Sequence, residues 1–222
     1  MVNKNQEDVG EDIIRFHRIV TRSLEIITQN INQYLENGAI EEEKREGFIK
    51  YLQSFSTVLD AHHALENEKI FPYFEDKLPD APYDRLISQH TLFLKSLTEI
   101  NGAINNLKSN TDELESLNLI KTSLRLIDKM WGPHMKIEED HIYEKVGDLN
   151  LGLDENNRLR EEFSKFFGEH AGPAYLVAPF VLYNLSPKDR EMQAQILPEI
   201  VTKQVNTDWK DKWVSMKPFL LE

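Results

Sequence analysis

The chain contains no cysteine. This absence excludes disulfide bonds, thiolate metal ligands, cysteine-ligated iron–sulfur clusters and cysteine nucleophiles. Any metal site must therefore be built mainly from histidine, aspartate and glutamate. The sequence also lacks a P-loop, a nucleophile elbow and a glycine-rich dinucleotide-binding fingerprint, so these common catalytic motifs do not account for its function.

Long apolar runs and excess positive charge are absent too. No stretch approaches the roughly 18 apolar residues of a membrane span, and the most apolar segment, "YLVAPFVLY" (175–183), is interrupted by Pro179. The N-terminal residues are polar and lack the apolar core of a signal peptide. The net charge of −12 argues against nucleic-acid and anionic-membrane partners. We expect a cytoplasmic protein with no nucleic-acid partner and no membrane partner.

Apolar residues recur with the period of an amphipathic helix over most of the chain. Strand patterns are nearly absent. The helical stretches are 11–36, 41–76, 84–108 and 112–146. The sequence therefore predicts an all-α protein in which residues 1–150 form an up-down-up-down four-helix bundle.

The pattern changes after residue 150. Residues 151–222 contain shorter helical segments together with aromatic residues and prolines. We expect a mostly helical C-terminal extension packed on the bundle. The alternatives are an independent domain or a lid that shapes a substrate pocket.

Histidines interrupt the apolar faces of all four predicted helices. Two of them are followed four residues later by glutamate, and side chains at this spacing lie on one face of a helix. A buried carboxylate without a partner is costly, and a bound cation removes that cost. The residues concerned are His17, His62 with Glu66, His90, and His134 with Glu138.

The spacing of these residues repeats. His17 and His62 are 45 residues apart, and His90 and His134 are 44 apart. A duplicated αα-hairpin would bring the two sets together from opposite sides of one core, and four imidazoles with two carboxylates suit two divalent metal ions. Nitrogen and carboxylate donors favour iron or manganese over structural zinc. A single buried histidine, by contrast, is more simply explained as a structural residue bonded to a neighbour.

Four segments resemble the motifs of hemerythrin-like (HHE cation-binding) proteins over residues 9–147. They are "FHRIV" (16–20), "HHALENEKIFP" (62–72), "SQHTLFL" (88–94) and "HMKIEED" (134–140). The resemblance implies a four-helix bundle with an oxo- or hydroxo-bridged di-iron centre. It also implies that the four histidines are terminal ligands and that Glu66 and Glu138 bridge the metals.

Two departures from the family pattern concern the ligand set. Oxygen-carrying hemerythrins have a further histidine one turn after the third-helix ligand, where this chain has Leu94. The missing ligand would leave a coordination position for water or substrate. These relatives also place the second bridging carboxylate five residues after its histidine, at Glu139 here. Helical geometry favours Glu138, because i+4 lies about 40° from the histidine and i+5 about 140°, so Glu139 is the second choice.

Two further histidines lie beside these motifs. His141 falls two turns after His134 and is a candidate replacement for the missing ligand. His63 adjoins His62 but points about 100° away from it. We therefore favour a supporting or surface position for His63 over direct coordination.

The segment "MWGPHMKIEE" (130–139) contains two residues that disfavour a helix. Gly132 and Pro133 come directly before His134, and proline in a helix interior costs about 3 kcal/mol. The matching segment of the first half, "VLDAHHALEN" (58–67), contains neither. We predict a local kink just before His134 that offsets one metal-binding turn from its counterpart.

These observations favour a non-haem di-iron protein that binds O₂, iron or both, with manganese as a possible replacement for iron. The alternative is a di-iron oxidase or oxygenase that activates O₂ or peroxide on a small-molecule substrate at the same centre. A third hypothesis is a helical interaction protein whose buried histidines are structural.

Overall fold

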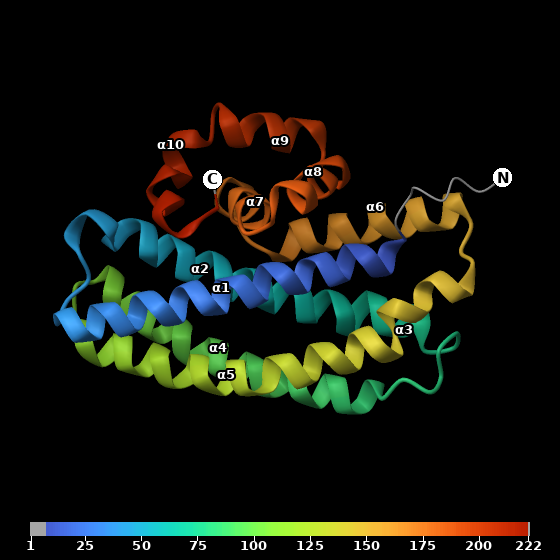
Figure 1. Ribbon diagram of the computed structural model, residues 1–222, viewed down its shortest axis with the longest axis horizontal. Coiled ribbons are helices and arrows are strands. Elements are labelled where there is room, and N and C mark those ends of the chain that lie inside the picture. Colours follow the sequence, from blue (N-terminus) through green and yellow to red (C-terminus); the bar gives the residue numbers. More distant parts are fainter. Residues whose placement is uncertain (1–7, 222) are drawn as a thin grey trace.

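The computed structural model describes residues 8–221, and helices are the only regular secondary structure in that part of the chain (Figure 1). The long helices are α1 (Val9–Asn37), α2 (Glu42–Leu65), α4 (Tyr83–Lys108) and α5 (Glu113–His141). Helices α1 and α4 each pack against both α2 and α5, so the long helices close into a bundle. The predicted all-α bundle is confirmed. Within residues 8–221, no helix is long and apolar enough to cross a membrane.

The bundle has two apolar cores with a buried polar layer between them. The first core takes side chains from every long helix, for example Ile27, Phe55, Leu97 and Leu124. The second core includes Ile13, Leu65, Leu86 and Ile142. Each fully buried aliphatic side chain contributes about 1.5–3 kcal/mol. The predicted histidines fall at the boundary between the cores: along α1, His17 lies between Ile13 of the second core and Val20 of the first.

The sequence predicts one helical stretch over residues 41–76. In the structure the α-helix α2 ends at Leu65. A π-helical turn, η1 (Glu66–Ile70), joins α2 to the short α3 (Phe71–Phe74). The backbone N–H of Phe71 donates to the carbonyl of Glu66, five residues earlier. Pro72 gives a physical reason for the wider turn. It has no N–H to donate, and in an α-helix its ring would clash with the carbonyl four residues before it.

Helix α5 continues without interruption through Gly132 and Pro133. Gly132 and Pro133 therefore do not end the helix, and the kink just before His134 stays a prediction. Pro133 lies on the exposed side of the helix, and so does Lys129, whose carbonyl loses its intrahelical partner and can bond to water instead. The departure from α-helical geometry occurs in the other half of the repeat, at η1.

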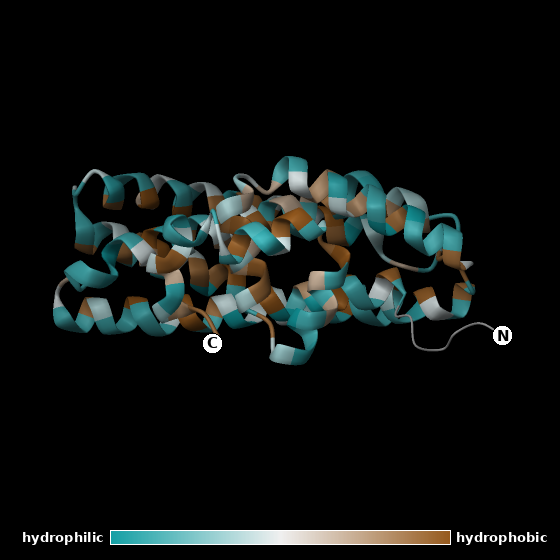
Figure 2. Cartoon of the chain, turned by 90° about the horizontal axis from the view of Figure 1, so that it is seen from above, coloured by the Kyte–Doolittle hydropathy of each residue, from teal (hydrophilic) through white to brown (hydrophobic). Residues whose placement is uncertain are grey.

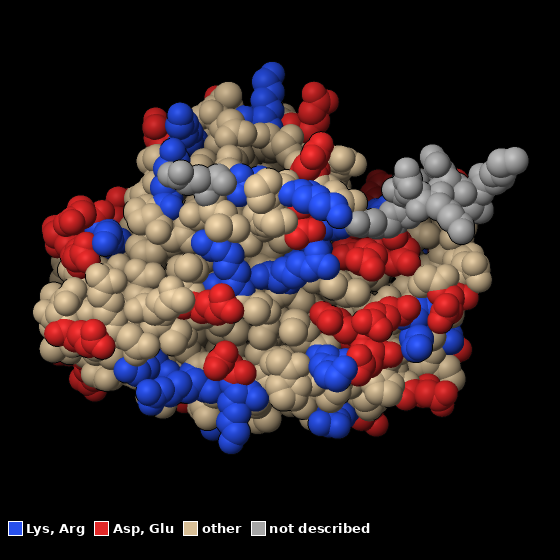
Figure 3. Space-filling view, in the orientation of Figure 1, with Lys and Arg blue, Asp and Glu red and all other residues tan. Residues whose placement is uncertain are grey.

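Shorter helices follow the bundle and pack mainly on α1 and α2 (Figure 1). They are η2 (Tyr143–Leu149), α6 (Leu153–His170), α7 (Ala174–Tyr183), α8 (Pro187–Ile196), α9 (Glu199–Asn206), α10 (Lys210–Trp213) and η3 (Val214–Phe219). Hydrophobic residues gather on the inner sides of the helices where this extension meets the bundle (Figure 2). On the outer face, acidic and basic side chains are mixed along the junction with α1 (Figure 3). One such pair joins Arg18 of α1 to Asp189 of α8 at 2.9 Å.

A buried polar contact also attaches the extension to the bundle. Asn184, at the end of α7, is buried, and its Oδ1 accepts hydrogen bonds from Arg22 and, at 2.6 Å, from the Tyr51 hydroxyl. Arg22 also donates to the carbonyl of Phe219 at 3.0 Å. Burial raises the pKa of Tyr51 to about 12, so the phenol keeps its proton for this hydrogen bond at neutral pH.

Gly47 of α2 marks a close approach between the bundle and η3. A Cβ placed there would overlap the backbone carbonyl of Ser215. We expect Gly47→Ala to displace η3 from α2 and to lower the free energy of unfolding by about 1–3 kcal/mol.

The matched control is Gly102→Ala in α4, where an added Cβ meets no atom within 4 Å. The higher helix propensity of alanine should stabilise this variant by about 0.5–1 kcal/mol. Denaturant unfolding measures both changes. Equal stability changes in the two variants would contradict the close packing of η3 on α2.

Candidate metal centre

The six residues predicted as metal ligands lie in the polar layer between the two cores. Helix α1 supplies one histidine, α2 and η1 supply a histidine and a glutamate, α4 supplies a histidine, and α5 supplies a histidine and a glutamate. All six side chains are at most 3% exposed. They are His17, His62, Glu66, His90, His134 and Glu138.

Glu138 turns its two carboxylate oxygens to different histidines. Its Oε1 lies 3.0 Å from Nε2 of His134 and 3.4 Å from Nε2 of His90. Its Oε2 lies 3.4 Å from Nε2 of His17. The carboxylate thus faces histidines from both halves of the repeat.

Glu66 is arranged in the same way. Its Oε1 lies 3.4 Å from Nε2 of His62, and its Oε2 lies 3.4 Å from Nε2 of His90. A carboxylate that presents one oxygen to each of two histidine sets has the geometry needed to bridge two cations. Glu66 and Glu138 both have this geometry.

The possible ligand atoms fall into two groups of four, and within each group the atoms lie within 4.8 Å of one another. The His17 group consists of His17, His62, Glu66 and Glu138. The His63 group consists of His63, Glu66, His90 and His134. Because Glu66 belongs to both groups, the two candidate cation positions are adjacent.

The fifth histidine in these groups is His63, which the sequence analysis placed in a supporting or surface position. His63 is 4% exposed and stacks on the ring of His90, with the centroids 4.2 Å apart. Leu94, the position of the further histidine in oxygen-carrying hemerythrins, is 51% exposed. A side chain at position 94 therefore faces away from the polar layer, whereas His63 lies within it.

Hydrogen bonds from outside the layer orient three of the imidazoles. Each donates its Nδ1–H to a side-chain oxygen, so its Nε2 points into the layer. The pairs are His17 with Glu139 at 2.8 Å, His90 with Asn67 at 2.8 Å, and His134 with Gln89 at 2.9 Å. Asn67 and Gln89 were missed by the sequence analysis, although each is adjacent in sequence to a predicted ligand.

Glu139 and His141 both lie outside the ligand cluster. Glu139 is half-buried and contacts the outer nitrogen of His17, so Glu138 is the carboxylate directed into the site. His141 is exposed. Its expected place on the buried face is wrong because the helix ends directly after it, at Ile142.

Tyr143 is a further residue that the sequence analysis missed. It begins η2, just beyond α5, where helical periodicity no longer predicts which side chains are buried. Its hydroxyl donates to Oε1 of Glu66. Burial, followed by the negative charge of Glu66, raises the pKa of Tyr143 well above its usual range. The phenol therefore stays protonated and holds the Glu66 carboxylate in place.

Five buried polar atoms in the layer have no hydrogen-bond partner. They are Nε2 of His17, His62 and His63, and Oε2 of Glu66 and Glu138. A buried polar atom without a partner costs about 1–3 kcal/mol, and these five atoms are all possible metal ligands. Cations bound in the two groups would satisfy all five atoms, so the residues present fit a metal site.

Burial and mutual contacts shift the pKa values of the groups in the metal-free site. Burial, together with repulsion from other histidines, lowers the pKa values of His62, His63 and His90, so these imidazoles are neutral at pH 7. Burial and the nearby Glu138 raise the pKa of Glu66 well above its usual range. Burial acts the same way on Glu138, but hydrogen bonds with histidines, above all His134, hold its pKa well below the usual range.

These observations define a helical bundle whose core carries two overlapping His/Glu groups suited to metal binding. Residues 9–146 match the family model for the hemerythrin HHE cation-binding domain. The chain belongs to this family, as the resemblance of its motifs implied. Searches of curated proteins and of solved structures find no significant match.

The metal-free protein is predicted to lose stability as the pH falls from 7 to 5. Histidines with lowered folded-state pKa values stay neutral in the fold, while the unfolded chain binds protons below its ordinary value of 6.5. Each such histidine can contribute a slope of up to about 1.4 kcal/mol per pH unit. Glu66 opposes this loss of stability, because its raised pKa lets it bind a proton in the fold as the pH falls. The pKa of His17 is raised by Glu138 and Glu139 despite burial, so above pH 6.5 its protonation also stabilises the fold as the pH falls.

Denaturant unfolding of chelator-treated protein across this pH range measures the slope. His63→Asn should reduce it, because the variant removes one buried neutral histidine, whereas exposed His141→Asn should leave it unchanged. A wild-type stability that is flat or rises toward pH 5 would contradict the prediction.

Proposed function

We propose that the protein is a non-haem di-iron protein that binds O₂ at a His/Glu site in the bundle core. The observation that carries this proposal is the placement of Glu66 and Glu138, each with one oxygen toward histidines from each half of the repeat. Manganese would suit the same nitrogen and carboxylate donors. Structural histidines alone would explain the site poorly, because they would be expected to have hydrogen-bond partners, and three of them lack a partner at Nε2.

The ligand set is unequal between the two positions. The His17 group supplies two imidazoles and the His63 group supplies three. Glu138 Oε1 also lies beside His90 and His134, so if both carboxylates serve both cations, the His17 position would have four protein ligands and the His63 position five. A cation in the His17 group would then keep one more coordination position for water, O₂ or peroxide, and open positions are what substrate binding at a metal requires. When bound, a pair of iron ions supplies the electrons and the Lewis acidity that O₂ binding or activation needs.

The protein side chains have separate tasks in this scheme. The imidazoles would hold the cations, and Glu66 and Glu138 would supply carboxylate oxygens to both. Tyr143 fixes one carboxylate through its hydrogen bond to Glu66. Glu139 orients His17 from outside the cluster.

A second candidate function is a di-iron oxidase or oxygenase acting on a small-molecule substrate with O₂ or peroxide. A specific observation favours it. A large, mainly apolar cavity between the bundle and the extension includes His62 in its wall, on the side of the cluster with fewer imidazoles. A protein that only stores or carries O₂ has no need of such a cavity.

The first test is metal content and the optical spectrum of protein reconstituted with ferrous iron, recorded in air and after reduction. We expect about two iron ions per chain and near-ultraviolet oxo-to-iron bands that disappear on reduction. His62→Ala should lose the bands and about one of the two ions, because it removes a ligand of the His17 group only, whereas the exposed control His141→Ala should retain the bands and both ions. A wild-type protein that holds no iron would overturn the proposal.

O₂ consumption then separates the two candidates. Reversible uptake, restored by lowering the O₂ pressure, supports a carrier or sensor. Irreversible uptake accompanied by a product supports the oxidase or oxygenase.

The role of His63 gives a separate prediction. If His63 is a ligand of one cation, His63→Ala should reduce the iron content from about two ions to about one per chain, because the His17 group remains complete. Elemental analysis with the oxo-bridge band as a second readout measures the change. Retention of both ions and of the band would show that His63 is not a ligand.

A further inference from the structure

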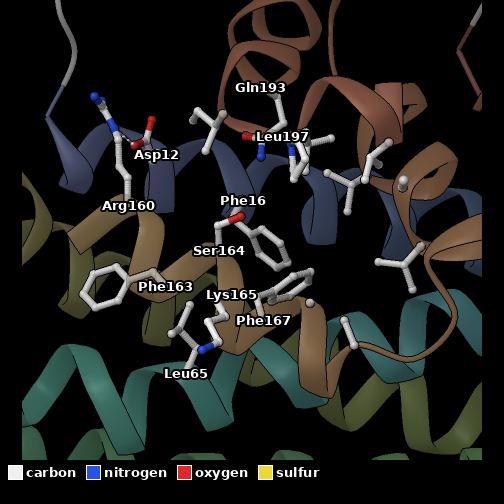
Figure 4. A pocket seen from close by; sticks show the side chains of 18 of the residues that line it. Asp12, Phe16, Leu65, Arg160, Phe163, Ser164, Lys165, Phe167, Gln193 and Leu197 are labelled. Carbon is white, nitrogen blue, oxygen red and sulfur yellow. Dashed lines mark hydrogen bonds and ion pairs between the residues drawn. The ribbon is translucent and has the colours of Figure 1, made fainter. Parts of the chain in front are cut away.

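A cavity of about 860 Å³ lies between the bundle and the C-terminal extension (Figure 4). Its walls come from α1 and α2 on the bundle side and from α6, α7, α8 and α9 on the other. Small-molecule sites in proteins have volumes of about 300–1,000 Å³, so this cavity is large enough for a substrate. Well-packed interiors leave few voids larger than a water molecule, and a space of this size is not a packing defect.

The cavity is lined mostly by apolar side chains. Phe16 of α1 and Phe167 of α6 meet edge to face, with ring centroids 5.1 Å apart (Figure 4). The other apolar lining residues include Leu65, Phe163, Val181, Leu197 and Val201. Such a surface favours an apolar ligand, because burying it against apolar atoms yields about 25 cal/mol per Å².

Three of the charged side chains in the wall pair with one another, and Glu161 and Lys165 also line the cavity. Asp12 accepts a hydrogen bond from Arg160 of α6 at 2.6 Å and from Arg15 at 3.0 Å. Figure 4 shows Asp12 and Arg160 together, away from Phe16 and Phe167. Asp12 thus bonds to both arginines, and the apolar side chains around Phe16 and Phe167 form the surface that a mainly apolar ligand would contact.

The cavity and the candidate metal centre share one wall. His62 lines the cavity, and its Nε2 lies 3.4 Å from Oε1 of Glu66 inside the His/Glu cluster. Phe16 stacks on the imidazole of His62, with ring centroids 4.8 Å apart and an interplanar angle of 22°. A molecule in the cavity would therefore lie beside the His17 group, where coordination positions are left for O₂.

The wall opposite the bundle is loosely built. Helix α8 has no buried side chain, although Met192, Gln193 and Ile196 of that helix line the cavity. A helix without buried side chains gains little from packing, so it can move to admit a ligand at low cost.

We propose that this cavity binds an uncharged, mainly apolar organic molecule and that this molecule is the substrate of the metal centre. The substrate role rests on the proposed function, whereas ligand binding by the cavity does not. The ligand enters past α8, contacts Phe16 and Phe167, and reaches the wall formed by His62.

Binding is tested first without metal. Fluorescence titration of chelator-treated protein with N-phenylnaphthylamine, an uncharged aromatic probe, should saturate at one probe per chain. Gly168→Phe should weaken binding by about tenfold or more, because Gly168 lines the cavity and an added Cβ there meets no atom within 4 Å. Ser164→Leu, one turn earlier on the same face of α6, should also weaken it.

The matched control is Gly102→Phe, since Gly102 is also a helical glycine with no atom within 4 Å of an added Cβ but is outside the cavity. Binding equal to wild type in the control and weakened in both cavity variants supports the proposal. Absence of saturable binding, or equal binding by all three variants, overturns it.

Closeness to the metals is tested with para-trifluoromethylbenzyl alcohol by fluorine NMR. Protein loaded with paramagnetic manganese(II) should broaden the trifluoromethyl resonance more than protein loaded with diamagnetic zinc, and Gly168→Phe should abolish the difference. Equal broadening with both metals overturns the substrate role. Failure to bind iron overturns the proposed function instead, and probe binding by the metal-free protein still decides whether the cavity is a ligand site.

Discussion

The structure depends on one constraint, which is the burial of ionisable side chains at the boundary between two apolar cores. Five imidazoles and two carboxylates occupy this layer, and five of their polar atoms lack hydrogen-bond partners. The apolar cores on either side hold the helices in register, so the layer cannot relax by opening to water. The free-energy cost of the unsatisfied atoms is removed most directly by a cation, which links the stability of the fold to the occupancy of the site.

The geometry of α2 explains how adjacent histidines serve different positions. Helix α2 packs between α1 and α4, and consecutive helical residues point about 100° apart. His62 therefore faces His17 of α1, while His63 faces His90 of α4. The π-helical turn directly after them begins at Glu66 and keeps that carboxylate between both sets. Single π-helical turns inside α-helices are frequent at functional sites.

Most of the fold and of the ligand set could be predicted from the sequence. Helical periodicity and the HxxxE spacing act within single helices, so they identify His62 with Glu66 and His134 with Glu138 without knowledge of the packing. His63 was undervalued because its role depends on which helices flank α2, which periodicity does not encode. Tyr143 was missed and His141 was misplaced because periodicity within a helix does not predict where the helix ends. Pro133 does not interrupt α5, whereas Pro72 accompanies a wider turn, because the effect of a proline depends on the hydration and neighbours of the freed carbonyl.

The extension breaks the symmetry that the repeat would otherwise give the site. It packs mainly on α1 and α2, and the cavity between it and the bundle has His62 of the His17 group in its wall. The same group has two imidazoles, whereas the His63 group has three. In a symmetric duplicated bundle, either cation could meet a substrate equally well. Here the cavity and the stacked pair of Phe16 and His62 lie beside the His17 group, so under the proposed function this is the group at which O₂ and substrate would meet.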